Sequence, residues 1–421
     1  MMLTPVFVAS SGRSGTTALM SVLGSDPRVA FDRVPPYEHR HLAYFAKVAG
    51  LAAGSPCGVP VAGPALEAHD AAAVGPVPWP TASSPDNPRP LGLTDGDVLT
   101  ALWGKFSAAA RARQPAWTHY AEKAPDWLPA AARAIVPART VYLVRDPRDV
   151  YLSVAAFNRA RGTLGFGRRP GDDDRAHART LARDLLVLFE NQRADAGRPD
   201  CATVRYDDLM TDGPAAVERL SAFLGLRLSA DPLAAAPPPD HQTSGIAALS
   251  VARWQREPLP PGVREFLECQ LAEALAFNGY EAPAAPPANL PLTADLPTSA
   301  DGSLVRGDDG TLAVRLTGDD FWVELPPTTV DARGVRELWL CVRGDTGDHC
   351  GVFWRAGRKP FAEERSVRVP FRPGRHWQVV RVPLAAHPRW RGRVTQLRLD
   401  LFNDCVEPGR GGAIRWARLV P

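Results

Sequence analysis

The segment from Ser10 to Thr17, SSGRSGTT, has the form of a phosphate-binding loop without its lysine. An apolar run precedes it and a helical pattern follows it, so backbone N–H groups converge there and the helix dipole adds partial positive charge. The position directly after Gly15, where a Walker loop has its lysine, holds Thr16. We therefore predict an anion site formed by Gly12, Arg13, Ser14, Gly15, Thr16 and Thr17.

The missing lysine bears on the group that the loop would hold. Without that lysine, and without a convincing acidic strand for Mg²⁺, hydrolysis of a nucleoside triphosphate is disfavoured. A transferable group with less charge than a γ-phosphate needs less neutralisation. The sulfuryl group of 3′-phosphoadenosine 5′-phosphosulfate (PAPS) is such a group, and its transfer requires no metal.

A second segment, LVRDPRDVYLS, places Arg145 at the end of an apolar run and Ser153 two turns into the helix that follows. PAPS carries a 3′-phosphate that ATP lacks. An arginine at a strand end and a hydroxyl on a helix can bind such a phosphate together. Arg145 alone would indicate no more than a surface ion pair.

These segments resemble those of the PAPS-dependent sulfotransferases, a family with a P-loop-like α/β fold. GRSGTT is similar to their 5′-phosphosulfate loop, in the arginine-containing form of tyrosylprotein, carbohydrate and many bacterial members. LVRDPRDVYLS is similar to their 3′-phosphate signature. VRYDDL (204–209) and EKAP (122–125) resemble two further segments, and the resemblance covers residues 3 to about 280.

The resemblance implies that PAPS is the donor, that the bisphosphate PAP is the product and that no metal is required. It implies that Tyr206 approaches the adenine. The segment 240–260 resembles a late segment of bacterial members that closes over the cofactor, with Ser250 and Arg253 on the 3′-phosphate side.

Transfer of a sulfuryl group needs a base for the acceptor hydroxyl and positive charge for the leaving 5′-phosphate. Arg13 remains charged at any accessible pH, so it can stabilise charge but cannot donate a proton. Lys123 is then the candidate to stand beside the bridging oxygen, as a lysine at a comparable position does in tyrosylprotein members. The alternative for Lys123 is a solvated cation after a strand.

Two residues compete for the role of base. Glu38 resembles the glutamate that serves as base in arginine-loop members, whereas His119 corresponds to the histidine of cytosolic relatives. We favour Glu38, because the loop type accompanies it. Arg40 and His41 are its neighbours, and we expect them to orient the acceptor.

The elements that must position these residues alternate between strand and helix patterns up to about residue 280. Alternation of this kind predicts a parallel sheet with helices on both faces. We expect this domain at 1–282 and a Pro/Ala-rich linker at 283–300. Residues 51–90 are too rich in Pro and Gly for regular elements, and either a lid over the site or disorder would explain them.

Residues 301–421 change character, with short alternating apolar runs between Gly, Pro and Asp. This pattern predicts an antiparallel β-sandwich, and it resembles galactose-binding-like jelly rolls. Trp354 and Trp390 are our candidates for stacking on a sugar ring, and burial in the core is the competing interpretation for each tryptophan.

Composition bounds the remaining possibilities. A net charge of +3 gives no signal for nucleic acid or membrane, and no apolar run reaches transmembrane length. Six scattered cysteines form no zinc pattern and fit reduced thiols, so we expect a cytoplasmic, bacterial protein. The sequence leaves the oligomeric state open.

We therefore expect a PAPS-dependent sulfotransferase whose acceptor is a glycan or a glycan-bearing molecule. Two alternatives remain open at this stage. The first is a P-loop kinase or nucleotide hydrolase, and the second is a non-catalytic carbohydrate-binding protein with a vestigial α/β domain.

Overall fold

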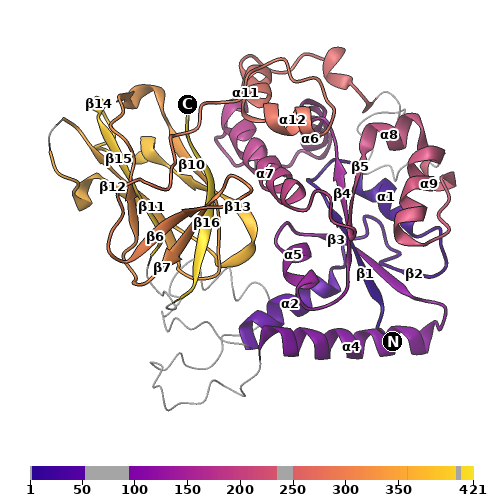
Figure 1. The fold of residues 1–421 in the computed structure, drawn as a ribbon. Helices are drawn as coiled ribbons and strands as arrows, with labels where there is room; N and C mark the ends of the chain where they lie inside the picture. The colour runs from indigo at the N-terminus through magenta and orange to yellow at the C-terminus, as the bar shows by residue number, and fades with distance from the viewer. Residues whose placement is uncertain (1, 53–93, 235–249, 358, 404–408) are drawn as a thin grey trace. The chain divides into compact units, whose positions relative to one another are not determined.

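The computed structural model describes residues 2–52, 94–234, 250–357, 359–403 and 409–421 (Figure 1). It divides into two compact units, Met1–Pro286 and Pro287–Pro421. Most of the segment 51–90 and residues 240–249 of the late segment lie outside the described residues, so the expectations for them stay predictions. None of the helices in the described ranges combines the length and the apolar character that a membrane crossing requires.

The first unit contains one parallel sheet of five strands in the order β2-β3-β1-β4-β5. Its strands are β1 (Thr4–Ala9), β2 (Val29–Ala30), β3 (His119–Ala124), β4 (Arg139–Val144) and β5 (Cys201–Arg205). Its helices are α1 (Thr16–Leu23), α2 (His41–Ala52), α4 (Asp95–Arg113), α5 (Leu128–Arg133), α6 (Pro147–Arg161), α7 (Asp174–Ala194), α8 (Tyr206–Thr211), α9 (Gly213–Leu224), α10 (Asp231–Ala234), α11 (Val263–Gln270) and α12 (Ala272–Phe277).

Helices cover both faces of this sheet, as the alternating pattern predicts. On one face Val6, Val8 and Val141 pack with apolar residues of α1, α8 and α9. On the other face Phe7 and Tyr120 pack with residues of α2, α4 and α5. The alternation of side chains along each strand therefore divides the unit into two apolar layers, and the predicted α/β class is confirmed.

Capping residues set the start of the predicted helices. The Asp146 carboxylate accepts a hydrogen bond from the backbone N–H of Arg148, and Pro147 occupies the first position of α6. Thr94 and Asp97 form a reciprocal capping box at the start of α4. Such caps satisfy backbone N–H groups that a helix leaves free. Both helices begin where their caps predict.

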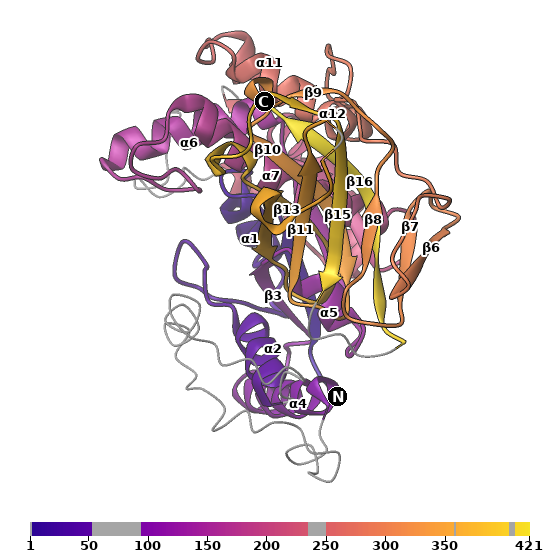
Figure 2. The same ribbon diagram turned by 90° about the vertical axis from the view of Figure 1, so that its left-hand side faces the viewer.

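The second unit is an antiparallel sandwich, as predicted (Figure 2). One sheet has the order β13-β10-β16-β7-β6 and the other β12-β11-β15-β8, and β14 pairs with β9. The strands are β6 (Gly302–Arg306), β7 (Leu312–Leu316), β8 (Trp322–Glu324), β9 (Val330–Asp331), β10 (Glu337–Gly344), β11 (His349–Arg355), β12 (Ser366–Pro370), β13 (Gly374–Val382), β14 (Arg393–Val394), β15 (Gln396–Asn403) and β16 (Gly411–Val420).

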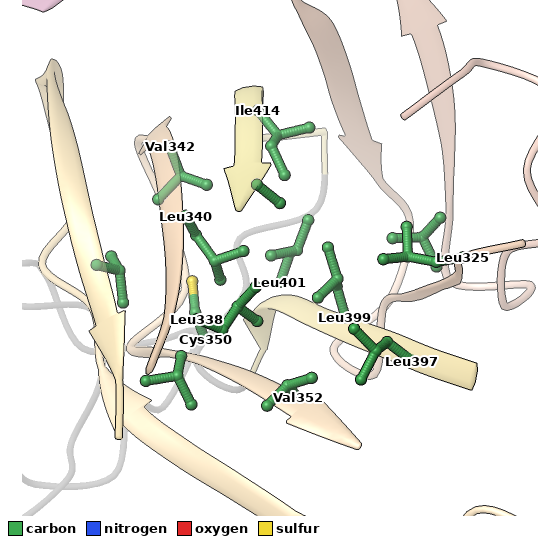
Figure 3. Close-up of a cluster of buried hydrophobic side chains, with 14 of the residues drawn as sticks. Leu325, Leu338, Leu340, Val342, Cys350, Val352, Leu397, Leu399, Leu401 and Ile414 are labelled. Atoms are coloured by element: carbon green, nitrogen blue, oxygen red, sulfur yellow. The ribbon is translucent and has the colours of Figure 1, made fainter. Parts of the chain in front are cut away.

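Alternate residues of the two sheets form the core of the sandwich. The strand β10 contributes Leu338, Leu340 and Val342, and β15 contributes three leucines with the same spacing (Figure 3). The two-residue period of a strand explains this pattern, since every second side chain points to the same face. Leu290 and Leu292, which lie in the segment expected as a linker, pack against this core.

The proposed sugar-stacking roles of Trp354 and Trp390 are wrong for this fold. Trp354 is 1% exposed and Trp390 is 7% exposed, and both belong to the core of the sandwich. Their rings meet edge to face at 5.2 Å, and the Trp390 indole N–H donates to the carbonyl oxygens of Ala332 and Val335. A buried ring with its polar atom satisfied has no face left for a sugar.

Leu340→Ala is expected to lower the free energy of unfolding by about 2–5 kcal/mol, the range for truncating a fully buried leucine. Leu340 is fully buried in β10. Denaturant-induced unfolding followed by tryptophan fluorescence measures the change. Val305→Ala is the control, since Val305 is exposed. Equal effects of the two substitutions would contradict the assigned core.

Candidate active site

The carboxyl ends of parallel strands meet at one edge of the sheet, and ligands of open α/β sheets bind there. The loop after β1, the end of β3, the loop after β4 and the start of α8 after β5 all reach this edge. Their residues include most of those that the sequence singles out. The sheet order β3-β1-β4 places the phosphate loop between Lys123 and Arg145.

Both glycines of the phosphate loop make room for aromatic rings. A Cβ atom on Gly12 would lie 2.4 Å from the ring of Phe166, and one on Gly15 would lie 2.3 Å from the ring of Tyr206. Gly15 also has a φ of 93°, a backbone conformation that residues other than glycine rarely adopt. The sequence predicts these glycines as part of an anion site. The structure adds a second reason, which is the close packing of two rings on the loop.

Lys123 joins three segments that are distant in the sequence. Its ammonium nitrogen lies 2.9 Å from Glu38 Oε1, 2.5 Å from the carbonyl oxygen of Pro36 and 3.3 Å from Thr17 Oγ1. The side chain is largely buried, and burial lowers the pKa of Lys123 although Glu38 opposes the shift. Lys123 is therefore not the solvated cation of the alternative interpretation.

Glu38 is held by two cations at the phosphate loop. Its Oε2 atom lies 2.6 Å from Arg40 Nη2, and its Oε1 atom accepts from Lys123. Partial burial alone would raise the pKa of Glu38, but the hydrogen bonds and charges of Lys123 and Arg40 outweigh it and lower the pKa. Glu38 is therefore ionised at neutral pH and can accept a proton.

Glu122, the neighbour of Lys123, holds the same region from the other face of the sheet. Its buried carboxylate accepts the backbone N–H groups of Leu42 and Ala43 at 2.9 and 3.1 Å, in the first turn of α2. Burial raises the pKa of Glu122 to about 7. Consecutive strand residues face opposite sides of the sheet. On one side of β3, Lys123 therefore holds Glu38, and on the other side Glu122 holds α2. The local pattern of EKAP does not predict this cap, because the capped helix lies far away in the sequence.

A cationic group lies on the other side of the loop. The guanidinium of Arg145 donates to the carbonyl oxygens of Arg13 and Ser250 at 2.8 and 2.7 Å, and lies 4.4 Å from the ring centre of Tyr206. Arg13 Nε lies 3.3 Å from Ser153 Oγ. Burial and then the nearby Arg145 lower the pKa of Arg13 to about 10. Two arginines packed closely enough to repel each other favour an anion between them.

Tyr206 and Ser250 complete this group. The hydroxyl groups of Tyr206 and Ser250 are 2.7 Å apart. Arg145 Nε is buried and has no hydrogen-bond partner within the described ranges. A buried donor without a partner is costly, and an anionic ligand would satisfy it.

His119 does not reach this edge of the sheet. It is the first residue of β3 and pairs in register with Thr4, whereas Lys123 pairs with Val8. Four residues of strand separate His119 from Lys123, which amounts to about 13 Å. Its ring instead contacts the hydroxyl of Thr118 at 2.8 Å. The position of His119 at the opposite end of β3 from Lys123 favours Glu38 as the base.

Two further predicted residues have other partners. Arg253 forms a two-pronged ion pair with Glu257, with both distances 2.7 Å. The ring of His41 lies 5.0 Å from the ring of Phe106 and 6.0 Å from that of Tyr120. No contact in the described residues joins either side chain to Lys123, Glu38 or Arg145, so their binding roles stay predictions.

The ion pair predicts how Glu38 titrates. Replacing Lys123 with Met removes the larger of the two cationic influences and leaves burial, so the pKa of Glu38 is expected to rise. Carboxyl ¹³C chemical shifts followed against pH measure this pKa. In the parent protein the value should lie below the ordinary range for glutamate, and in Lys123→Met it should lie above the parent value. An unchanged titration would show that the ion pair does not form in solution.

A model of the sulfotransferase family matches residues 5–230 of the chain. This range is more than half of the 421 residues. It includes the phosphate loop, Glu38, Lys123, Arg145 and Tyr206. The comparison with curated proteins found no match.

Solved structures of low identity resemble parts of the chain. The sulfotransferase domain of an olefin synthase from Synechococcus PCC 7002 is 21% identical, with a TM-score of 0.36, and the match covers 67% of this chain and 97% of that domain. Retinol dehydratase, solved with androsterone and PAP, is 20% identical with a TM-score of 0.35, covering 67% and 84%. A xylan-binding module from Roseburia intestinalis is 14% identical with a TM-score of 0.22, covering 31% and 93%.

Proposed function

The chain belongs to the sulfotransferase family, and we propose that it moves a sulfuryl group from PAPS to a hydroxyl group of a glycan or a glycan-bearing molecule. One observation carries this proposal. Lys123 links a carboxylate, Glu38, to the first turn of the helix that follows the phosphate loop, at Thr17. A proton acceptor and a cation thus lie together where the transferred group would be held.

The residues at the loop fit a donor with two separate phosphate positions. Backbone N–H groups of the loop and Arg13 would hold the 5′-phosphosulfate. Arg145 and Ser153 would bind the 3′-phosphate, and the unpartnered Arg145 Nε supports that assignment. Tyr206 and Ser250 line the same side as Arg145. When bound, the donor supplies a sulfuryl group on a phosphate leaving group.

The chemistry of the chain's own residues follows from the ion pair. Glu38 accepts the proton of the acceptor hydroxyl as the acceptor oxygen bonds to sulfur and the sulfur–oxygen bond to the 5′-phosphate breaks. The lowered pKa of Glu38 keeps the carboxylate ready for this step. The ammonium of Lys123 and the guanidinium of Arg13 stabilise the negative charge that develops on the departing phosphate.

The second unit enters this proposal without assigned sugar contacts. Trp354 and Trp390 are buried in its core, so a glycan-binding role for the sandwich would require other residues. Each residue to which this proposal gives a donor-binding or catalytic role lies within the first unit, as does Arg253.

Calorimetric titration tests the choice of donor. PAP is expected to bind in the micromolar range without Mg²⁺ and more tightly than ATP. Arg145→Ala should weaken PAP binding by about 1.5–3 kcal/mol, the range for a hydrogen bond to a charged group. Adenosine 5′-phosphosulfate, which lacks the 3′-phosphate, is the control ligand and should hardly respond to Arg145→Ala. Mg²⁺-dependent binding and turnover of ATP would indicate a kinase or hydrolase instead, and no nucleotide binding would indicate a non-catalytic protein.

Glu38→Gln is expected to reduce kcat by about 10²–10⁴-fold, the contribution of a general base, while PAP affinity is kept. Gln preserves the shape and one acceptor oxygen but cannot take up a proton. His119→Ala is the comparison, because His119 lies at the opposite end of β3 and should lose less activity. Initial rates of PAP release measure both. Loss of activity in His119→Ala, together with retained activity in Glu38→Gln, would show that His119 and not Glu38 is the base.

A further inference from the structure

Exposed apolar side chains gather on two segments that flank the phosphate loop. Among the described residues of the first unit, most large exposed apolar side chains lie there: Val34, Tyr44, Leu164 and Phe166. Val34 precedes Glu38 in its segment, and Leu164 and Phe166 follow α6. In Figure 2 the segment before α2 and the end of α6 both extend to the left of β3. Leu164 and Phe166 are exposed apolar side chains two residues apart in one loop, and neighbouring exposed apolar side chains are typical of interaction sites.

The loop after α6 is held so that Phe166 faces the phosphate loop. Asn158 makes two hydrogen bonds to Gly165, from its amide to the carbonyl oxygen at 3.2 Å and from the Gly165 N–H to its oxygen at 3.1 Å. Buried His177 Nε2 lies 3.3 Å from the carbonyl oxygen of Phe166. Both contacts fix backbone rather than side chain. They therefore determine where Phe166 and its neighbours point.

The conformation of Phe166 is itself unusual. Its φ is 55°, in the left-handed region that is unfavourable for a residue with a side chain. Glycine would occupy that position without strain, and glycines stand on both sides of it. A bulky apolar residue kept there by surrounding hydrogen bonds points to a use for its side chain.

The ring of Phe166 packs against Gly12, the residue before Arg13. It also lies edge to face with Phe157, at 5.4 Å between ring centres, and Arg13 lies 4.6 Å from the Phe157 ring centre. Phe166 is therefore an apolar wall beside Gly12 of the phosphate loop, with Phe157 between its ring and Arg13. Packing alone does not explain the loop, because Phe166 stays 36% exposed and nearby Leu164 stays 52% exposed.

We propose that the acceptor is an amphiphile, in which the accepting hydroxyl is attached to an aliphatic or aromatic body that lies against Leu164 and Phe166. This inference rests on the proposed function and narrows its acceptor. The expected acceptors are glycan-bearing molecules with an apolar part next to the sugar. Free sugars are expected to be poor acceptors. The hydroxyl reaches Glu38, and the apolar body remains outside the phosphate loop.

Two probes that share a sugar and differ in their tail test the inference. Methyl β-D-glucoside and octyl β-D-glucoside, the second below its micelle-forming concentration, are titrated by calorimetry into the PAP-loaded protein. The octyl compound is expected to bind at least about tenfold more tightly, which corresponds to the burial of about two methylene groups. PAP release from PAPS with each glucoside gives a second readout in the same order.

Two variants locate the effect, and a third controls for unspecific apolar binding. Phe166→Ala and Leu164→Ser should each reduce the octyl-to-methyl affinity ratio severalfold. Leu164→Ser keeps the inference testable if Phe166→Ala disturbs the loop, because Leu164 is half exposed. Phe277→Ala removes a more exposed ring, from α12, and should leave the ratio unchanged.

The outcomes separate this inference from the proposed function. If the two glucosides bind the PAP-loaded protein with equal affinity, the inference of an amphiphilic acceptor is wrong, even if the protein transfers sulfuryl groups. A ratio that survives both loop variants, or falls as much in Phe277→Ala, also overturns it. A protein that binds no PAP contradicts the proposed function. PAP binding, together with a preference for the octyl glucoside that both loop variants reduce, supports the proposed function and the inference together.

Discussion

The fold of the first unit depends, at its functional edge, on one buried ammonium group. Lys123 binds the carbonyl oxygen of Pro36, the carboxylate of Glu38 and the hydroxyl of Thr17, so a cation in β3 sets the position of the segment after β2 and of α1. A buried cation requires paired oxygens around it, and here these oxygens come from the residues that the chemistry needs. The same contacts hold the proposed base and lower its pKa.

The phosphate loop meets a second constraint, which is the packing of rings. Gly12 and Gly15 lie under Phe166 and Tyr206, and any side chain at either position would collide with a ring. The backbone of the loop is thereby enclosed by aromatic surface on two sides. The ring of Tyr206 lies on the side of Arg145, where we place the nucleotide. The ring of Phe166 lies on the side where we place the acceptor. The loop is thus both a candidate anion site and a packing surface.

Much of this arrangement could be read from the sequence, because it depends on local patterns. The apolar run of β4 followed by Asp146 and Pro147 predicts a buried strand and a capped helix, and both occur. The two-residue alternation after residue 301 predicts the sandwich. What the sequence could not supply is long-range position. The spacing of His119 and Lys123 does not say which lies at the functional edge, but the parallel register of β3 with β1 does.

Burial and partner choice set the remaining limits of prediction. The sequence allows Trp354 either to stack on a sugar or to pack in a core, and the packing of the two sheets places it in the core. No local pattern in the sequence indicates the roles of Glu122 and Phe166. Glu122 caps a helix 80 residues away in the sequence, and Phe166, which follows α6, packs on the phosphate loop. The decisive measurement is the transfer of radiolabelled sulfur from PAPS in the presence of a metal chelator. We expect label in an acceptor and an equal amount of PAP. Label that stays in the nucleotide with every hydroxyl-bearing acceptor, or transfer that stops when metal is removed, would contradict it.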